Sequence, residues 1–403
     1  MQREIRTSEI IELSGLLFLH GMALGAWFVP LGTVLDATGF QSIKPFAFAT
    51  SATAALVSPL FFGALADRFI APPRLLRWLA LATAASLVLV SLAIQRGFPS
   101  WAVLAAIQLQ SLCAAPTSSL SVSIILGRLK DSGRLFGPIR AMGTLGWMIG
   151  CWVISALGAD SSTQAFHASA LGWLLLALYT HSVAGKTPTP SGKRLTLRER
   201  LGLDALSLLK IRDHRVVFIT LTLFSIPIAA FYPFTPTHLR ALSLERTSAW
   251  MSAGQVTEIL AMFALSAMLA RWRLKWILAT GLGLGLLRYL FYMMDRSGWV
   301  LGGVVLHGFA FTFTIVVAQV YLSQRIDPAW RTRAQALFSL LVSGVGSLLG
   351  YVGSGLWFRV SQQSIGSPWP QFWGGLAAAI AAVLVYFLIA YRGRASQAAD
   401  PGA

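Results

Sequence analysis

The chain has 403 residues, of which 56% are hydrophobic and only 12% are charged. Soluble globular proteins carry about 25% charged residues, so this composition excludes an ordinary soluble domain and indicates an integral membrane protein. The net charge of +17 would suggest nucleic-acid binding on a soluble protein, but here the basic residues lie in alternate loops and are better explained as an orientation signal. We therefore expect the lipid bilayer as a partner and no nucleic acid.

Apolar runs of membrane-spanning length follow one another along the whole chain. A spanning helix needs about 20 apolar residues, and the polar breaks leave room for roughly a dozen of them with short loops. The sequence therefore predicts an all-α, multi-pass membrane protein with twelve transmembrane helices. The expected spans are 10–35, 43–66, 75–95, 100–126, 137–158, 164–184, 216–239, 249–270, 275–294, 299–322, 334–358 and 370–391.

Lys and Arg are distributed unevenly over the connections between these spans. The basic side includes both ends of the chain, with Arg3 and Arg6 at the start and Arg392 and Arg394 in the tail. Loops on the other side carry few basic residues, among them Arg96. Because cytoplasmic loops are enriched in Lys and Arg, we expect a bacterial inner-membrane protein with both termini in the cytoplasm.

The central segment divides the chain. Residues 186–215 begin with the Pro- and Gly-containing sequence KTPTPSGKR and end in a basic amphipathic stretch. This pattern predicts a cytoplasmic linker with a helix lying on the membrane interface. Six spans on each side of a basic linker are typical of a transporter built from two repeated halves. We predict a six-helix bundle in residues 1–185 and a second, with a short cytoplasmic tail, in residues 216–403.

The loop between the second and third spans contains Gly63, Asp67 and Arg68 in a G-x-x-x-D-R pattern. Glycine permits close helix approach, and Asp67 can accept a hydrogen bond from a backbone N–H or an Arg across the loop. The alternative is an ordinary charged loop. The pattern resembles the loop signature of the major facilitator superfamily, which implies a role in gating and conformational stability and no contact with substrate.

The fifth span places Arg140, Thr144 and Trp147 at positions i, i+4 and i+7. They share one helix face. A cation, a hydroxyl group and an aromatic ring on one face suit a flat polar ligand, with Trp147 as the stacking surface. The alternative is that Arg140 extends to the membrane interface while Trp147 packs against lipid or core.

The eighth span carries Gln255 and, three residues later, Glu258. Glu258 lies roughly 13 Å into a hydrocarbon core about 30 Å thick. Acids at that depth are costly and usually functional, and desolvation favours the neutral form, so Glu258 is a candidate proton carrier. The structural alternative is a buried ion pair with Arg288 of the ninth span. A pair that breaks on protonation would combine both roles, so we place Arg288 in proton coupling as well.

Other polar or aromatic residues inside spans are weaker candidates. Gln110 and Thr312 could line a cavity or bond between helices, and Trp27 could stack on a ligand or pack between helices. His20 and His307 fit hydrogen-bonded core residues better than a proton relay.

Several kinds of active site are absent from the sequence. There is no Walker loop, no metal-ligand cluster and no G-x-S-x-G motif. A membrane-embedded enzyme would need a His/Asp cluster at a membrane face, and a sensor or scaffold would normally bring a further soluble domain. We therefore predict a secondary transporter that is not an enzyme, has no cofactor or metal, and works as a monomer.

The sequence resembles the nucleoside:proton symporter family of the major facilitator superfamily over nearly its whole length. The segments that carry the resemblance are HGMALGAWFVPLGT, GALADR, GPIRAMGTLGWMIGCWVIS, LGLDALSLLK, SAGQVTEIL, LLRYLFY and DPAWRTRAQALF. The resemblance implies the major facilitator fold and proton-coupled nucleoside uptake. It also implies that Arg140, Thr144 and Trp147 line the nucleoside site and that Gln255 and Glu258 join them.

Other positions depart from that family. Its seventh-span polar pair falls on Ala229 and Tyr232, and its tenth-span Asp falls on Thr312. The loss of an acid and two amides changes the hydrogen-bonding groups of the pocket. A sugar or another small polar solute is therefore a competing substrate, and transport without proton coupling, by a facilitator or exporter, is a further alternative. If Thr312 cannot carry a proton, Glu258 is the deep acid that remains.

Overall fold

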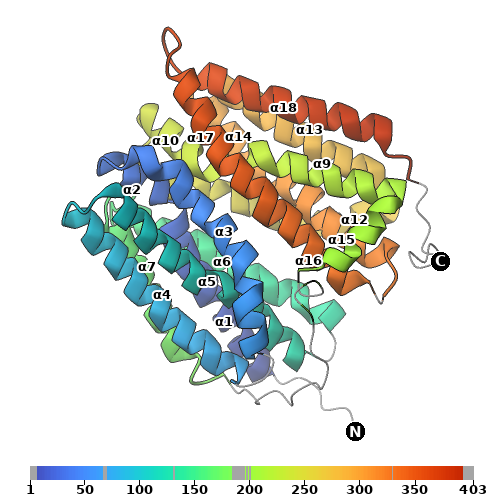
Figure 1. The fold of residues 1–403 in the computed structure, drawn as a ribbon, viewed down its shortest axis with the longest axis horizontal. Helices are drawn as coiled ribbons and strands as arrows, with labels where there is room; N and C mark the ends of the chain where they lie inside the picture. Colours follow the sequence, from blue (N-terminus) through green and yellow to red (C-terminus); the bar gives the residue numbers. More distant parts are fainter. Residues whose placement is uncertain are drawn as a thin grey trace. The chain divides into compact units, whose positions relative to one another are not determined.

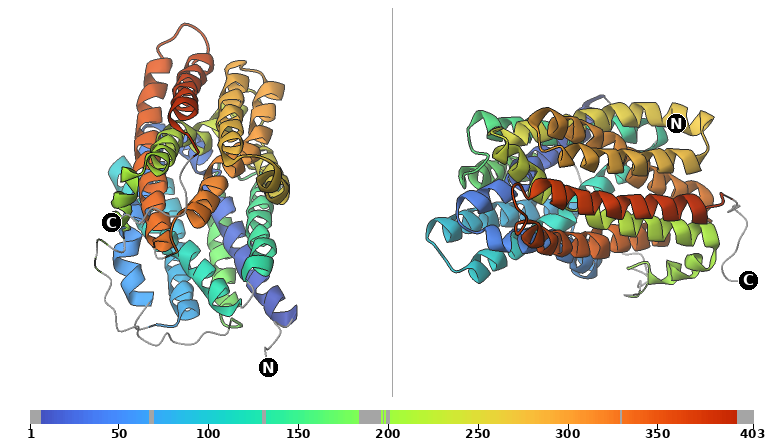
Figure 2. Two further views of the ribbon diagram at one scale, coloured as in Figure 1. Left: turned by 90° about the vertical axis from the view of Figure 1, so that its right-hand side faces the viewer. Right: turned by 90° about the horizontal axis from the view of Figure 1, so that it is seen from above.

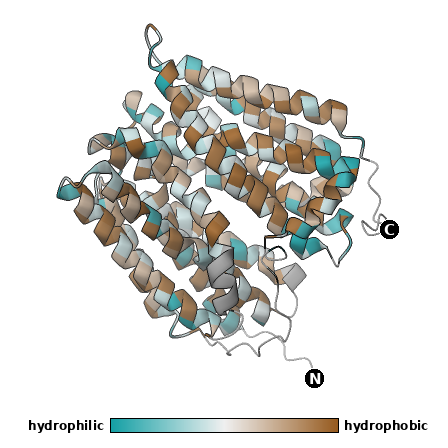
Figure 3. Ribbon diagram, viewed as in Figure 1, coloured by the Kyte–Doolittle hydropathy of each residue, from teal (hydrophilic) through white to brown (hydrophobic). Residues whose placement is uncertain are grey.

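The computed structural model describes residues 7–66, 70–129, 132–183, 196, 198, 201–328 and 330–393. Every regular element in these ranges is a helix, so the predicted all-α class is confirmed for the described chain. Apolar residues cover most of the length of the long helices, and hydrophilic residues gather at helix ends and in loops (Figure 3). The chain forms two compact units: unit 1 is Met1–Arg194 with Glu245–Ser252, and unit 2 is Leu195–Leu244 with Ala253–Ala403.

Unit 1 is built around its first helix. The described helices of this unit are α1 (Thr7–Phe28), α2 (Leu31–Ala37), η1 (Gln41–Ile43), α3 (Lys44–Ala66), α4 (Pro72–Gln95), α5 (Ser100–Arg128), α6 (Ser132–Ala156), α7 (Gln164–Tyr179) and α11 (Thr247–Met251). α1 packs along α6 and α7, and α4 packs against α5 and α7 (Figures 1 and 2). A Cβ atom at Gly21 would collide with the carbonyl of Gly143, and one at Gly150 with the carbonyl of Met22. These glycines let the backbones of α1 and α6 come into contact. The contact fixes the rotation of α6 about its axis, and so determines which of its residues face away from α1.

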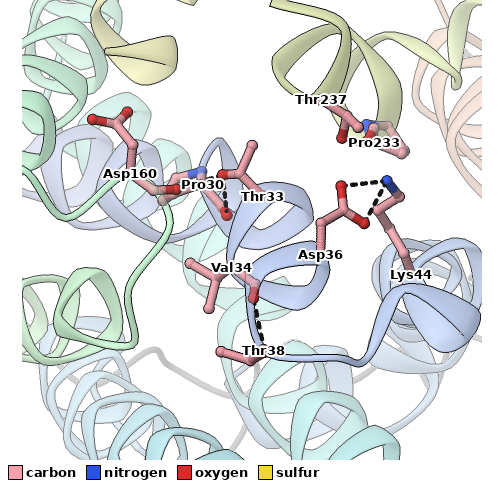
Figure 4. A network of polar contacts seen from close by, with 9 residues as sticks. All are labelled: Pro30, Thr33, Val34, Asp36, Thr38, Lys44, Asp160, Pro233 and Thr237. Atoms are coloured by element: carbon pink, nitrogen blue, oxygen red, sulfur yellow. Dashed lines mark hydrogen bonds and ion pairs between the residues drawn. The ribbon is translucent and has the colours of Figure 1, made fainter. Parts of the chain in front are cut away.

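The short helix α11 belongs to unit 1, although its chain neighbours on both sides belong to unit 2. Asp160, which follows α6, holds it in place: its Oδ1 accepts the backbone N–H of Ser248 at 2.6 Å and the hydroxyl of Ser155 at 3.0 Å. The carbonyl of Asp160 in turn accepts the hydroxyl of Thr33. Figure 4 shows Asp160 beside Thr33, and it also shows the ion pair of Asp36 with Lys44 that joins α2 to the start of α3.

Unit 2 contains the remaining helices. They are η2 (Leu203–Lys210), α9 (Arg212–Ile228), α10 (Phe231–Ala241), α12 (Ala253–Arg271), α13 (Leu274–Met293), α14 (Ser297–Phe311), η3 (Thr312–Val316), α15 (Val317–Arg325), α16 (Arg331–Ser339), η4 (Leu340–Gly346), α17 (Ser347–Ser361) and α18 (Trp369–Ala390). α13 packs against α14 and α18, and α9 packs against α17 and α18 (Figure 1). α12 crosses α14 where a Cβ atom at Gly308 would collide with the backbone nitrogen of Glu258.

Two long helices of unit 2 contain π-helical turns. The run from α14 to α15 passes through η3, and the run from α16 to α17 passes through η4. A π-helical turn inserts a residue into the helix and is found frequently at functional sites. A different interruption lies between α9 and α10, which are separate helices although Arg212–Ala241 forms one apolar stretch. Pro227, near the end of α9, lacks the N–H that would continue the hydrogen-bond ladder.

Nine stretches of the described chain are long and apolar enough to cross a membrane. They coincide with nine of the expected spans. The second, sixth and eighth expected spans coincide with α3, α7 and α12. The count of twelve transmembrane helices therefore stays a prediction.

The segment before α9 is only partly described. η2 is a 3-10 helix that buries Ala205 and Leu208 and leaves Leu206 exposed. It packs against α16 and α9, and the left-handed conformation of Gly202 precedes it, with a φ of +67°. α9 begins at Arg212, earlier than the expected start of the seventh span at residue 216. The interfacial helix expected in the linker stays a prediction.

Candidate functional site

Each unit contributes its own set of candidate residues. In unit 1 the residues Arg140, Thr144 and Trp147 lie on one helix, α6. Arg140 is exposed, and Thr144 and Trp147 are half-buried. The ring of Phe28, at the end of α1, lies 6.1 Å from the Trp147 ring at an interplanar angle of 62°. The Phe48 ring of α3 lies 5.2 Å from Phe28 on another side. The candidate group of unit 1 is therefore an aromatic cluster that includes Trp147, on a helix that also carries a cation and a hydroxyl group.

The close contact between α1 and α6 positions this group. A Cβ atom at Gly25 would collide with the carbonyl of Trp147 and lie 3.0 Å from its Cα. The main chain of Trp147 therefore lies against Gly25 of α1. The indole of Trp147 lies beside Phe28, three residues after Gly25 on the same helix. A larger residue at position 25 would separate the two helices and move both rings.

Three other candidates of unit 1 lie in its interior. Trp27 is buried, with its ring 5.6 Å from that of Phe166. Gln110 is buried, and its Nε2 has no hydrogen-bond partner among the described residues. His20 forms a 2.8 Å hydrogen bond with the hydroxyl of Thr117, as expected of a core histidine. A role for Trp27 or Gln110 in substrate binding stays a prediction.

In unit 2, Tyr232 and Gln255 are in contact across two helices. The Nε2 of Gln255 on α12 donates a 3.4 Å hydrogen bond to the hydroxyl of Tyr232 on α10. Gln255 is buried, and its Oε1 makes no hydrogen bond to any described residue. Its acceptor atom is therefore available to a donor on a ligand, because a buried amide oxygen is costly to leave unsatisfied.

Glu258 is half-buried on α12, one turn beyond Gln255. Its backbone nitrogen lies at the crossing with α14, opposite Gly308. The hydroxyl of the preceding residue, Thr257, donates a 2.6 Å hydrogen bond to the carbonyl of Val305 and fastens the same crossing. The position of Glu258 along its helix is therefore fixed against α14.

Thr312 is fully buried at the first residue of the π-helical turn η3. Its hydroxyl oxygen has no hydrogen-bond partner among the described residues. Sequence patterns did not indicate this turn, because a π turn has no signature in hydrophobic periodicity. The tenth-span candidate thus lies at an irregular point of its helix.

Arg288 on α13 is the most buried cation among the candidates, with 0% of its surface exposed. Its Nη1 forms a 2.6 Å hydrogen bond with Nδ1 of His307 on α14. Its Nε and Nη2 have no hydrogen-bond partner among the described residues. The guanidinium carbon lies 4.8 Å from the ring centroid of Phe231 and 4.6 Å from that of Tyr289. The expected ion pair between Glu258 and Arg288 stays a prediction.

The partner of Arg288 was not identified as a functional residue from the sequence. His307 is buried, as expected of a core histidine, and its ring stacks on Phe231 with centroids 4.0 Å apart. The Tyr232 ring meets it edge-on at 6.1 Å. The only sequence signal was a histidine inside a span, and nothing in the spacing related it to Arg288 on the preceding helix.

The gating-loop prediction is described only in part. Gly63 lies in α3, whereas Asp67 and Arg68 lie outside the described residues. Among the residues that the structure describes, no three His, Cys, Asp or Glu side chains come together as a possible metal site.

Comparisons with known proteins agree over nearly the whole chain. The sequence model of a family described as Nucleoside H+ symporter matches residues 8–396. The chain is 31% identical to YegT of Escherichia coli (strain K12), a candidate nucleoside transporter, over 94% of this chain and 93% of that protein. It is 26% identical to the nucleoside permease NupG of the same organism, over 90% of this chain and 91% of that protein.

Solved transporter structures share the fold. A crystal structure of the nucleoside transporter NupG matches with a TM-score of 0.86 and 22% identity, covering 95% of this chain and all of that one. A crystal structure of a D-xylose–proton symporter matches with a TM-score of 0.72 and 16% identity, covering 97% of this chain and 98% of that one. The curated relatives are transport proteins, which confirms the prediction that the chain is not an enzyme.

Proposed function

Because the chain belongs to the nucleoside H+ symporter family, we propose that it takes up a nucleoside together with a proton by alternating access to a midplane site. It is a multi-pass protein of the inner membrane. The observation that carries the proposal is the match of the family model over residues 8–396 of this chain. The aromatic group of unit 1 is suited to a nucleobase, and the polar group of unit 2 is suited to the hydroxyl groups of a sugar.

We assign the base to the aromatic group of unit 1. Trp147 and Phe28 offer ring faces, and stacking between an aromatic side chain and a base contributes about 1–3 kcal/mol. In unit 2 the Oε1 of Gln255 offers an acceptor and Tyr232 a hydroxyl, which suit the hydroxyl groups of a sugar. The full proposed substrate set is Arg140, Thr144, Trp147, Tyr232, Gln255, Glu258, Thr312, Gln110 and Trp27.

We assign the proton to Glu258, with Arg288 as the cation that responds to its charge. Thr312 cannot bind and release a proton at physiological pH. Glu258 lies on α12 at the crossing with α14, one residue along from Thr257. A carboxyl group so placed can be neutral in one state and charged in another.

The proposed architecture has twelve transmembrane helices in two six-helix bundles, residues 1–185 and 216–403. The linker of residues 186–215 and both termini face the cytoplasm in this proposal, and Gly63, Asp67 and Arg68 form a gating loop. The transporter works as a monomer. The excess of Lys and Arg in alternate loops supports this orientation.

A second candidate substrate is a sugar or sugar-like solute. The polar pair of the family's seventh span falls on Ala229 and Tyr232 in this chain, and the family's tenth-span acid falls on Thr312. These replacements change the hydrogen-bonding groups that would recognise a base or a ribose. A panel of nucleosides, nucleobases and sugars in a thermal-shift assay separates the two candidates. Stabilisation by a sugar and by no nucleoside would overturn the nucleoside assignment.

The proton-coupling proposal is tested with purified protein in liposomes. A pH difference of one unit, acidic outside, can concentrate a solute up to about tenfold when one proton accompanies each molecule. The wild type should approach that ratio, whereas Glu258→Gln should reach only equal concentrations and still exchange labelled for unlabelled nucleoside. Concentrative uptake by Glu258→Gln would show that Glu258 is not the proton carrier.

A further inference from the structure

The contact between Arg288 and His307 depends on the protonation of the imidazole. An arginine has only donors, so the Nδ1 atom that receives its Nη1–H at 2.6 Å must be an unprotonated acceptor. The neutral ring then carries its single proton on Nε2. A second proton would bind at Nδ1 and occupy the lone pair that holds Arg288.

The two ends of the imidazole face different helices. Nδ1 faces Arg288 of α13. The Cδ2 atom, which neighbours Nε2, faces α12, because a Cβ atom at Gly254 would lie 3.2 Å from it. His307 therefore lies between the cation of α13 and the helix that carries Gln255 and Glu258.

Arg288 has few contacts to keep it in its present position. Nη1 makes its one hydrogen bond in the described chain, while Nε and Nη2 make none. The guanidinium also makes cation–π contacts with the rings of Phe231 and Tyr289. Such contacts restrain the orientation of the guanidinium less than hydrogen bonds do. Loss of the bond to His307 would leave all three guanidinium nitrogens of a fully buried cation without a hydrogen-bond acceptor among the described residues, which favours a movement of Arg288 towards another acceptor.

We propose that His307 is a positioning residue for proton coupling, which holds Arg288 when the imidazole is neutral and releases it when the imidazole binds a proton. This inference rests on the proton-coupled transport proposed above. The incoming proton forms an N–H bond at Nδ1, no covalent bond breaks, and the hydrogen bond from Nη1 is lost. Two adjacent cations then repel each other in a medium of low dielectric constant, and Arg288 turns towards the carboxylate that α12 carries, Glu258.

The groups around His307 support this assignment. Tyr232 of α10 and Arg288 of α13 are titratable or charged side chains that contact the His307 ring. Tyr289 contacts Arg288 in turn, and α12 carries Glu258 at its crossing with Gly308, the residue after His307. The tyrosines stay neutral at physiological pH. The charges that can change or respond are therefore those of His307, Glu258 and Arg288. His307 also lies on the same helix run as Thr312, so it supplies that run with a titratable group.

The test compares His307→Asn with the wild type in liposomes. The Asn Oδ1 can accept the Nη1–H of Arg288 near the position of Nδ1, but it cannot bind a proton at physiological pH. We expect nucleoside exchange to continue with a flattened dependence on pH, because the Asn side chain cannot exchange a proton where the imidazole can. Accumulation under a one-unit pH gradient should fall from up to about tenfold to equal concentrations.

The matched control is His20→Asn. His20 is also a buried histidine with one hydrogen bond, but its partner is the uncharged Thr117, so the pH profile should not change. If the wild type accumulates nucleoside and His307→Asn does so with an unchanged pH profile, His307 has no role in coupling. If the wild type transports no nucleoside in response to a pH gradient, the proposed function itself fails.

A second measurement observes the imidazole in the wild-type protein and uses a variant only to identify the signal. Nitrogen-15 NMR of histidine-labelled wild-type protein, with the His307 signal identified by its loss in His307→Gln or His307→Asn, reports the tautomer directly. We expect an unprotonated Nδ1 and a protonated Nε2 at high pH, with protonation of Nδ1 as the pH falls. A ring with its proton on Nδ1 at high pH would overturn the proposal, because such a ring cannot accept from Arg288.

Discussion

Asp160→Ala should loosen α11 from unit 1. In the structure Oδ1 of Asp160 receives the backbone N–H of Ser248 at 2.6 Å, the hydroxyl of Ser155 at 3.0 Å and the hydroxyl of Thr247 at 3.3 Å. Asp160 is only 5% exposed, so water cannot easily replace these bonds. A five-residue helix has little stability of its own, and its place therefore depends on this carboxylate.

The size of the effect follows from these contacts. A hydrogen bond to a charged group contributes about 1.5–3 kcal/mol. Two of the three bonds come from α11, a short one from Ser248 and a long one from Thr247. The third comes from Ser155 of α6, whose hydroxyl accepts the backbone N–H of Ala249 in α11 at 2.9 Å. Allowing for partial replacement by water, we expect the free energy that holds α11 in place to fall by about 2–4 kcal/mol. At 1.4 kcal/mol per factor of ten, local opening should become about 30 to 700 times more frequent.

Hydrogen–deuterium exchange of a peptide that covers Glu245–Ser252 measures that opening. Asp160→Asn is the graded control, because the Asn keeps an Oδ1 acceptor but loses the charge, and it should give a smaller increase than Asp160→Ala. Amides of α18, in unit 2, should exchange as in the wild type. An increase of less than about threefold in the Asp160→Ala peptide would refute the reasoning, since it corresponds to less than about 0.7 kcal/mol.

Two further predictions concern packing and substrate stacking. Gly308→Val should abolish folding or expression, because even its Cβ would collide with the backbone of Glu258 and overpacking typically costs about 1–3 kcal/mol or more. Gly283→Ala is the control, because an added Cβ there meets nothing within 4 Å. In thermal unfolding it should be neutral or stabilise the protein by up to about 1 kcal/mol. Equal stability of the two variants would contradict the close contact of α12 and α14 at Gly308. Trp147→Ala should weaken apparent nucleoside affinity about tenfold in uptake assays, and Trp147→Phe should retain most of it, since stacking is worth about 1–3 kcal/mol. Unchanged affinity in Trp147→Ala would remove Trp147 from the site.

The fold could be predicted because membrane helices leave a strong signal in composition. Apolar runs bounded by polar breaks predicted α4, α5, α13 and α18 to within a few residues. The first expected span matches the apolar stretch Thr7–Ala37, which contains both α1 and α2. Runs of that length must form helices, because lipid offers no partner for backbone N–H and C=O groups. The same signal could not separate α9 from α10, since both lie in one apolar stretch interrupted only by local backbone geometry.

The candidate site was predictable where its residues share one helix. Arg140, Thr144 and Trp147 follow from helical spacing alone, and so does the pairing of Gln255 with Glu258 along α12. Contacts between helices were not predictable, because spacing within one segment contains no information about the neighbour of a side chain. The place of α11 in unit 1 is the clearest case, since the sequence attaches it to α10 and α12 of unit 2.

The burial of Arg288 argues for function over stability. Nε and Nη2 have no hydrogen-bond partner in the part of the chain that the structure describes, which costs about 1–3 kcal/mol each, and more for a charged group. Two cation–π contacts return about 1–2 kcal/mol each, and the bond to His307 about 1.5–3 kcal/mol. These terms nearly cancel, so an apolar side chain of similar volume would serve the core at least as well.

A cation that contributes so little to the fold is better explained by a second arrangement in which its donors are satisfied. The acid placed at the crossing of α12 and α14 is Glu258, and the group that holds Arg288 in the present arrangement is a histidine that can exchange a proton. Proton binding at His307 would therefore move charge within unit 2 without requiring an acid at Thr312. The departure from the tenth-span acid of the family is then compatible with proton coupling, because the helix run of Thr312 carries His307 as a titratable positioning residue in addition to the proposed proton carrier, Glu258 of α12.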